Sequence, residues 1–124
     1  MQEMLFSIQK NLSDLCNINM NIFFSKQAEF ILSDKPFVGV KDGSLISNTD
    51  EISSDCDYFL PLSKNICVHL NGEGQLLRFL EISEDGVGKI NKLQIASANK
   101  FVIASSIDVL AMNLDNAGVE YVVK

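Results

Sequence analysis

One stretch of the sequence argues most directly for a sheet: Ile66-Cys67-Val68-His69-Leu70-Asn71-Gly72-Glu73-Gly74. Every second residue from Ile66 to Leu70 is aliphatic, which predicts a strand with these residues inward and His69 on its outward face. Cys67 is expected to behave as a small core residue. An Asn-Gly pair between two apolar runs is the strongest short-range signal of a β-hairpin, and a second apolar run follows at residues 75–82. We therefore predict a hairpin whose turn is formed by this Asn-Gly pair.

Upstream of this hairpin, three apolar runs predict further strands: Met20–Phe24, Phe30–Leu32 and Phe37–Val40. The first two are rich in Ile and Phe, which favour strands. The short polar segment 25–29 between them fits a hairpin turn. Pro36 disfavours the helical region for the residue before it, so the chain is expected to stay extended there.

Helices are expected towards both ends of the chain. Residues 1–15 carry apolar side chains at spacings of three and four, which is typical of one apolar helix face. A short helix is expected at residues 90–98, after a turn bracketed by Gly86 and Gly88. Residues 101–104 would then form a compact buried strand.

The last segment, residues 106–124, predicts a helix followed by a terminal strand. Ser105 or Ser106 can cap this helix, because a serine hydroxyl accepts an otherwise unpaired amide of the first turn. Asp108 lies in that first turn, where a negative charge suits the helix dipole.

Length and composition fit one globular domain. The chain has 124 residues, of which 47% are hydrophobic and 21% are charged. We expect a single α+β domain over residues 1–124, with a mainly antiparallel β-sheet, an N-terminal helix, and two C-terminal helices packed on the sheet. Residues 19–106 form its β-rich part.

The formal net charge of −6 excludes several functions. It opposes binding to nucleic-acid phosphates and to anionic membranes, so neither is expected as a partner. A basic protein partner fits the charge, and the sequence leaves a homo-oligomer open. Three widely spaced cysteines and one histidine make no zinc set, and reduced thiols indicate a cytoplasmic protein. The paired glycines lack the rest of any phosphate-binding motif, so no cofactor, metal or catalytic residue is expected.

The candidate binding surface is the segment from Lys41 to Asp57. Its composition predicts a surface loop of about 15 residues, longer than a compact domain needs to connect two strands. No basic residue follows Lys41 until Lys64. The segment contains five acidic side chains: Asp42, Asp50, Glu51, Asp55 and Asp57. Such a surface would attract a basic partner, although a solvated loop explains the same composition.

Asp34 is a further candidate, and it allows two interpretations. Its carboxylate can accept hydrogen bonds from amides one or two residues further on, before Pro36, and so fix a turn. A ligand-binding or catalytic aspartate would need the same position at the exposed end of a strand. The structural interpretation is favoured.

The stretch Phe30-Ile31-Leu32-Ser33-Asp34-Lys35-Pro36-Phe37 resembles the Phe-Ile-x-Ser-Asp-Asn-Pro-Val signature of a bacterial family, the domain of unknown function 4238. Two further features follow in that family's order. Phe59-Leu60-Pro61-Leu62-Ser63 is similar to its Phe-Pro-Leu-Ser segment, and residues 91–105 are similar to its closing Asn-rich helix and strand. The resemblance covers residues 19–106 and implies a fold more than a function.

The chain departs from the family pattern in three ways. Lys35 stands where the family has Asn, and Leu60 is inserted before Pro61. The family's N-terminal helical region, with its Gln-His-Tyr-Val-Pro motif, has no counterpart in this sequence. The resemblance therefore implies that an activity residing in that region would be absent here.

Two functions from different classes fit these observations. The first is a non-enzymatic protein-binding or inhibitory module that acts through its acidic surface, with a phage or another mobile element as a candidate source. The second is a cut-down relative of a larger enzyme or nucleic-acid-processing protein, with a site near Asp34. One histidine, one arginine and no acid–base pair at a meaningful spacing favour the first.

Overall fold

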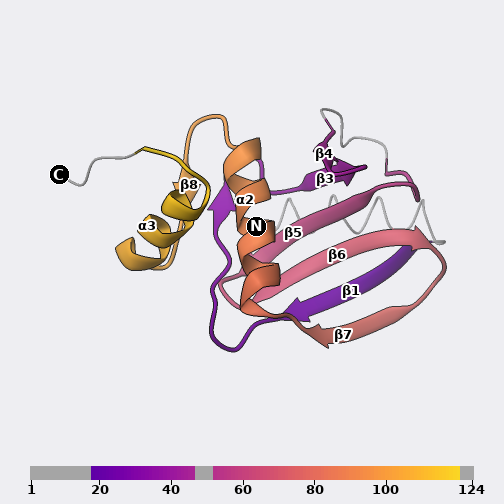
Figure 1. Cartoon of the computed structure of the whole chain (residues 1–124). Coiled ribbons are helices and arrows are strands. Elements are labelled where there is room, and N and C mark those ends of the chain that lie inside the picture. The colour runs from indigo at the N-terminus through magenta and orange to yellow at the C-terminus, as the bar shows by residue number, and fades with distance from the viewer. Residues whose placement is uncertain (1–17, 47–51, 121–124) are drawn as a thin grey trace.

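The computed structural model of the chain describes residues 18–46 and 52–120. In this part a six-stranded sheet of order β4-β3-β5-β6-β1-β7 is accompanied by a two-stranded sheet and two helices (Figure 1). The large sheet consists of β1 (Ile18–Phe24), β3 (Val38–Lys41), β4 (Ser44–Leu45), β5 (Asp57–Ser63), β6 (Ile66–Glu73) and β7 (Leu77–Glu81). The other elements are β2 (Leu32–Ser33), β8 (Val102–Ile103), α2 (Glu84–Ser97) and α3 (Ile107–Asn116).

Only β1 and β7 pair in parallel, while the other paired strands of the described sheets are antiparallel. The predicted α+β class with a mainly antiparallel sheet is therefore confirmed. The helix expected over residues 1–15 lies outside the described residues. Of the two C-terminal helices, α2 packs on the sheet and α3 packs against α2.

The centre of the sheet is buried on both faces. In β6, Cys67 is fully buried and His69 is only 9% exposed, although they alternate with the buried Val68 and Leu70. The expected core position of Cys67 is confirmed, because α2 lies across that face (Figure 1). Val87 of α2 packs there in one cluster with Cys67. The expectation that His69 faces outward is wrong, because Phe23 and Phe59 stack on its ring.

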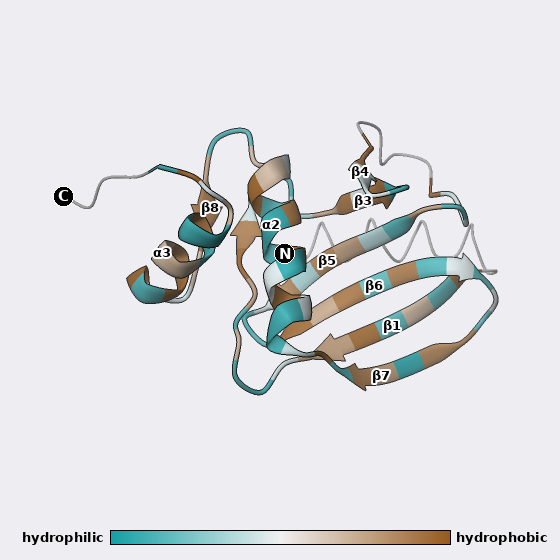
Figure 2. Ribbon diagram, in the orientation of Figure 1, coloured by the Kyte–Doolittle hydropathy of each residue, from teal (hydrophilic) through white to brown (hydrophobic). Residues whose placement is uncertain are grey.

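The opposite face of the sheet carries the second part of the core. Hydrophobic residues recur at every second position along the central strands, as the colour bands in Figure 2 show. The buried residues of this cluster are Ile18, Ile52, Cys56, Tyr58, Val68 and Leu70. Two of them, Ile52 and Cys56, belong to the segment that the sequence suggested was a surface loop.

The predicted hairpin between residues 66 and 82 is wrong, because β1 lies between β6 and β7. The short connection passes the beginning of β1 and is held there by the Asn19 side chain. Asn19 Nδ2 donates to the carbonyl of Glu73 at 3.1 Å, and Asn19 Oδ1 accepts from the amide of Leu76 at 3.1 Å. An Asn-Gly pair indicates positive φ, but it does not reveal that another strand lies between the strands before and after it.

Gly72 forms a β-bulge instead of the predicted turn. Ile18 faces Glu73 and Asn19 faces Asn71 across the β1–β6 pair, so Gly72 has no opposite residue. Its φ of +65° lies in the left-handed region, which favours glycine. The Asn-Gly pair therefore does place a positive φ at Gly72, but in a bulge and not in a hairpin turn.

The hairpin predicted across residues 25–29 is also absent from the described sheets. β1 pairs with β6 and β7, and β2 pairs with β8. Segment 25–30 instead passes the β5–β6 turn, where the amides of Ser25 and Phe30 donate to the carbonyls of Asn65 and Lys64. These contacts direct the chain away from the large sheet and towards α2.

The acidic segment contains structure that the sequence interpretation missed. Asp42 and Gly43 both have positive φ, 52° and 79°, and form the two-residue turn between β3 and β4. Asp-Gly is a recognised signal for this turn, and it was available in the sequence. Residues 47–51 lie outside the described part of the chain.

The C-terminal region is partly as predicted. Helix α2 begins at Glu84, so Gly86 and Gly88 lie inside it instead of bracketing a turn before it. Residues 101–104 are not a buried strand, since β8 contains only Val102 and Ile103, and Ile103 is 57% exposed. The expected terminal strand falls mostly on residues 121–124, outside the described part.

The predicted start of α3 is confirmed. Ser106 is its N-cap and accepts a hydrogen bond from the amide of Val109, and Asp108 lies in the first turn. The helix ends at Asn116, followed by Gly118 with a φ of +73°.

Candidate functional site

Asp34 holds the loop that follows α2. Its Oδ1 accepts hydrogen bonds from the amides of Asn99, Lys100 and Phe101, at 2.9, 3.1 and 3.4 Å. Desolvation acts to raise the pKa of Asp34, but these backbone amides outweigh it and hold the pKa below its ordinary value. Asp34 thus has a structural role, although its partners lie far along the chain and not next to Pro36.

The turn before Pro36 depends on Ser33 instead. Ser33 Oγ accepts a hydrogen bond from the amide of Lys35 at 3.0 Å, and the Ser33 amide donates to Gln94 Oε1 of α2 at 3.1 Å. Gln94 Nε2 in turn donates to the carbonyl of Pro36 at 2.7 Å. The stretch that resembles the family signature therefore binds α2 and fixes its position.

The acidic residues lie together at the end of the large sheet where β3 and β6 end and β5 begins. Asp42 lies in the β3–β4 turn, Asp55 precedes β5, and Asp57 begins β5. Glu73 ends β6 beside them, because Val40, Asp57 and Asn71 are neighbours across β3, β5 and β6. We call Asp42, Asp55, Asp57 and Glu73 the acidic end.

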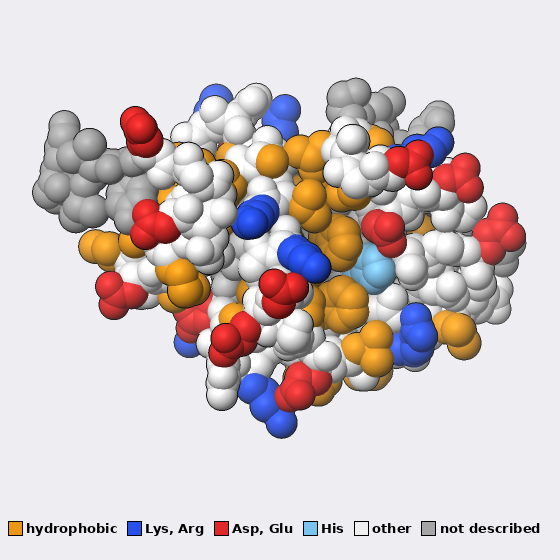
Figure 3. All heavy atoms as spheres, in the orientation of Figure 1, with side chains coloured by type: hydrophobic (Ala, Val, Ile, Leu, Met, Phe, Trp, Pro, Cys, Tyr) orange, Lys and Arg blue, Asp and Glu red, His pale blue; other side chains and the backbone are white. Residues whose placement is uncertain are grey.

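Figure 3 shows acidic side chains gathered at one end of the molecule. Asp50 and Glu51, the other predicted binding residues, lie outside the described part, and their role stays a prediction. The structure does not bring Asp34 to this end, because Asp34 is bound to the loop that follows α2.

Asp57 is held by a chain of hydrogen bonds that runs across four strands. Arg78 Nε donates to Asn21 Oδ1 at 2.9 Å. Asn21 Nδ2 lies 3.1 Å from His69 Nδ1, and His69 Nε2 lies 2.9 Å from Asp57 Oδ1. Because the guanidinium can only donate, it fixes the Asn21 amide with its nitrogen towards the ring. His69 is then the neutral tautomer that donates from Nε2 to Asp57.

The His69 ring lies between two phenylalanines. Its centroid is 5.2 Å from that of Phe23 and 4.7 Å from that of Phe59, with nearly parallel planes. In Figure 3 the histidine shows at the surface between hydrophobic side chains and an acidic one. With both ring nitrogens occupied, His69 serves here to orient Asp57, whose side chain is 50% exposed.

Sequence reasoning placed His69 on the outward face of its strand and missed this chain of contacts. One feature of the sequence could have indicated these contacts: polar residues at every second position of two apolar strands. They are Asn19 and Asn21 in β1, and His69 and Asn71 in β6. Their pairing could not be anticipated, because β1 and β6 are far apart in sequence and the prediction placed β6 beside β7.

The cysteines of the described part are free and buried. Burial raises the pKa of the Cys67 thiol to about 12, so it is protonated at neutral pH and a poor nucleophile. Burial also raises the pKa of Tyr58, whose hydroxyl accepts a hydrogen bond from the Ser53 amide at 2.8 Å. These groups serve the core.

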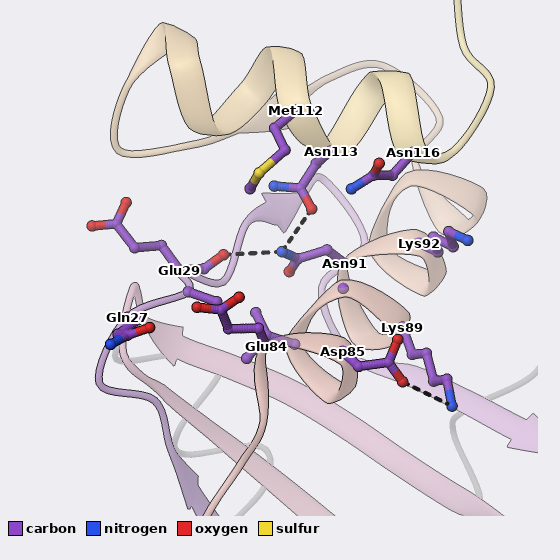
Figure 4. Close-up of a pocket in the computed structure, with 13 residues that line it drawn as sticks. Gln27, Glu29, Glu84, Asp85, Lys89, Asn91, Lys92, Met112, Asn113 and Asn116 are labelled. Atoms are coloured by element: carbon purple, nitrogen blue, oxygen red, sulfur yellow. Dashed lines mark hydrogen bonds and ion pairs between the residues drawn. The ribbon is translucent and has the colours of Figure 1, made fainter.

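A cleft of about 700 Å³ lies between α2, α3 and the segment around Glu29. Figure 4 shows Asn91 at its floor, where Nδ2 donates to the Glu29 carbonyl and to Asn113 Oδ1, both at 2.9 Å. Asn91 Oδ1 accepts from the amide of Ile31 at 3.0 Å. The buried amides of the cleft thus join three segments of the chain to one another.

Within residues 18–46 and 52–120, no three His, Cys, Asp or Glu side chains converge as a metal site would require. Over the same residues, neither helix has the length and apolar character needed to cross a membrane.

A family model described as a protein of unknown function (DUF4238) matches residues 2–108. The chain belongs to this family. The match extends beyond residues 19–106, the range over which the resemblance was expected, and takes in most of the N-terminal segment. Neither a curated protein nor a solved structure matches the sequence.

Membership of DUF4238 supports the fold-level resemblance but names no activity. In this member, the stretch from Phe30 to Phe37 holds α2 and the loop after it. The side chains of Ser33 and Asp34 in this stretch are engaged in internal hydrogen bonds.

Proposed function

We propose that this chain is a non-enzymatic protein-binding module, and that a basic segment of its partner docks on the acidic end. One observation carries the proposal: four carboxylates from separate turns and strand ends lie at one end of the sheet. The lysine ion pairs of the described residues lie elsewhere, on Glu29, Glu81 and Asp85. Within that part, the acidic end forms no ion pair with lysine or arginine, and His69 contacts Asp57 as a neutral hydrogen-bond donor.

The geometry of Asp57 supports the proposal further. His69 holds its Oδ1 at 2.9 Å, while half of the side chain stays exposed. A carboxylate that is already oriented loses less side-chain entropy when it accepts a charge-assisted hydrogen bond from lysine or arginine. The neighbouring carboxylates would speed the encounter with a cationic surface, and this effect weakens as salt screens the charges.

An inhibitory role would follow from the same surface. A basic groove that holds nucleic acid is one partner of suitable charge, and the acidic end would then compete with phosphates for it.

Binding to a lysine- and arginine-rich peptide tests the proposal, with fluorescence anisotropy as the measurement. The test variant combines Asp42→Asn, Asp55→Asn and Glu73→Gln. The control combines Asp108→Asn, Asp115→Asn and Glu120→Gln, which removes the same charge from α3 and the residues after it. We expect the test variant to bind about tenfold more weakly, or about 1.4 kcal/mol, and the control to bind like the natural chain.

Two outcomes would contradict the proposal. An equal loss in both variants would mean that the peptide responds to net charge alone. Equal binding by the natural chain and the test variant, at low and at physiological salt, would exclude the acidic end.

A further inference from the structure

The edge strand β7 carries the most exposed apolar surface of the sheet. It lies at the open side of the sheet in Figure 1, and Figure 2 shows it as largely hydrophobic. Leu77 is 58% exposed and Phe79 is 68% exposed. Both faces of the strand are affected, since Leu80, on the other face, is 38% exposed.

The outer backbone of β7 is also available for pairing. The Leu76 carbonyl accepts from Met20 at 2.8 Å, and the Ile82 amide donates to Phe24 at 2.9 Å. In a parallel pair a strand addresses its neighbour with alternate residues, so the even-numbered residues of β7 face β1. Leu77, Phe79 and Glu81 therefore direct their N–H and C=O groups away from the sheet.

In the part of the chain that the structure describes, this edge lacks the usual protection against pairing. Natural edge strands are short, bulged, interrupted by proline or charged on the surface. β7 contains five regular residues, and its two charged side chains are engaged: Arg78 donates to Asn21, and Glu81 pairs with Lys26 at 3.1 Å. The residue at the centre of this edge is Phe79, which is exposed and apolar.

We propose that β7 pairs antiparallel with β7 of a second copy of this chain, with Phe79 on the two-fold axis. In this register Phe79 faces Phe79, and Leu77 faces Glu81 of the second copy. These are the residues whose backbone groups point outward, so each opposed pair exchanges two hydrogen bonds. The two sheets then continue as one.

The charges of the chain favour this arrangement over its alternatives. Antiparallel pairing puts the two acidic ends at opposite ends of the joined sheet, whereas parallel pairing would bring them side by side. A register centred on Arg78 would set two arginines opposite each other, which is destabilising. With Phe79 at the centre, Arg78 faces Leu80, and the aromatic pair adds favourable contact.

The size of the contact sets the expected affinity. A standard protein interface buries about 1,600 Å², and one five-residue strand supplies only part of that area. We therefore expect a reversible dimer with a dissociation constant in the micromolar range.

Sedimentation velocity over a dilution series tests the dimer with the whole chain. The test variant is Phe79→Lys, which puts two like charges on the axis. Ile107→Lys is its control, because Ile107 is 70% exposed on α3 and the charge change is identical. We expect the natural chain and the control to double in mass at high concentration, and the test variant to dissociate at least about tenfold more readily.

Cross-linking makes the register itself testable. Phe79→Cys should form a disulfide-linked dimer under mild oxidation, because opposed residues of a hydrogen-bonded pair lie about 5.5 Å apart at Cα. Ile107→Cys and the natural chain measure the background. A natural chain that stays monomeric at every concentration would overturn the proposal. A dimer that persists in Phe79→Lys, or a Phe79→Cys variant that cross-links no faster than the background, would do the same.

Discussion

Two apolar runs of similar character differ in burial: one is covered and the other is exposed. Phe30 and Ile31 are 3% and 1% exposed and lie beneath α2, whereas Leu77 and Phe79 remain largely exposed on β7. The difference comes from their partners. The first run is covered by a helix whose polar side chains bond its backbone. The second lies at the edge of the sheet, and one side of it has no strand partner within residues 18–46 and 52–120. Apolar character alone therefore predicts a strand or core segment, but not what covers it.

The contact between α2 and the 30–36 segment combines apolar packing, of Phe30 on Val87 and Ile90, with buried side-chain amides. Asn91 and Gln94 are 1% and 0% exposed, and each bonds to backbone groups of that segment. Such bonds are directional, so they fix the position of the helix more tightly than apolar packing does. The contact is correspondingly sensitive to substitution.

The largest expected effect is at Asn91. Asn91→Leu keeps the number and branching of the side-chain heavy atoms but leaves the Ile31 amide, the Glu29 carbonyl and Asn113 Oδ1 without their partner. At about 1 kcal/mol or more for each unpaired buried group, we expect the free energy of unfolding to fall by about 3 kcal/mol. Urea unfolding measures it, with Asn116→Leu as the exposed control. A loss similar to that of the control would mean that these bonds do not hold the helix.

A smaller effect is expected at Gly72, in the bulge before the connection to β7. Gly72→Val should lower the free energy of unfolding by on the order of 1–2 kcal/mol, because a β-branched residue resists positive φ. Gly88→Ala is the matched control in α2. It has ordinary φ and open space, so it should raise stability by up to about 1 kcal/mol. An unchanged melting temperature for Gly72→Val would argue against the bulge.

The smallest effect, and one that depends on pH, is expected at Asp34. Its pKa is lowered in the folded chain, so its charged form stabilises the fold above the ordinary aspartate pKa, and this contribution disappears as pH falls through the folded value. Asp34→Asn should melt a few degrees below the natural chain near neutral pH. The two should converge below about pH 4. Asp115→Asn, on exposed α3, should show no such convergence, and a constant gap for Asp34→Asn would contradict the assignment.

The candidate site could be predicted only in part. The acidic character of residues 42–57 was visible in the sequence, as was the structural interpretation of Asp34. Glu73 could not be added to the acidic end, because its position beside Asp57 depends on the β5–β6 register. The hydrogen bonds from Arg78 to Asp57 required the positions of four strands, two of them misplaced by the hairpin prediction.

By itself, the sequence determined the local features of this protein: the α+β class, most of the strand positions, the serine cap of α3 and the need for glycine at residue 72. These depend on side-chain periodicity and on backbone preferences within a few residues. Only the tertiary structure decided that β1 inserts between β6 and β7, that His69 is buried beside Asp57, and that Asn91 and Gln94 bind the 30–36 segment. His69 and Asp57 are 12 positions apart, but the other contacts join residues more than 40 positions apart, which no local pattern encodes.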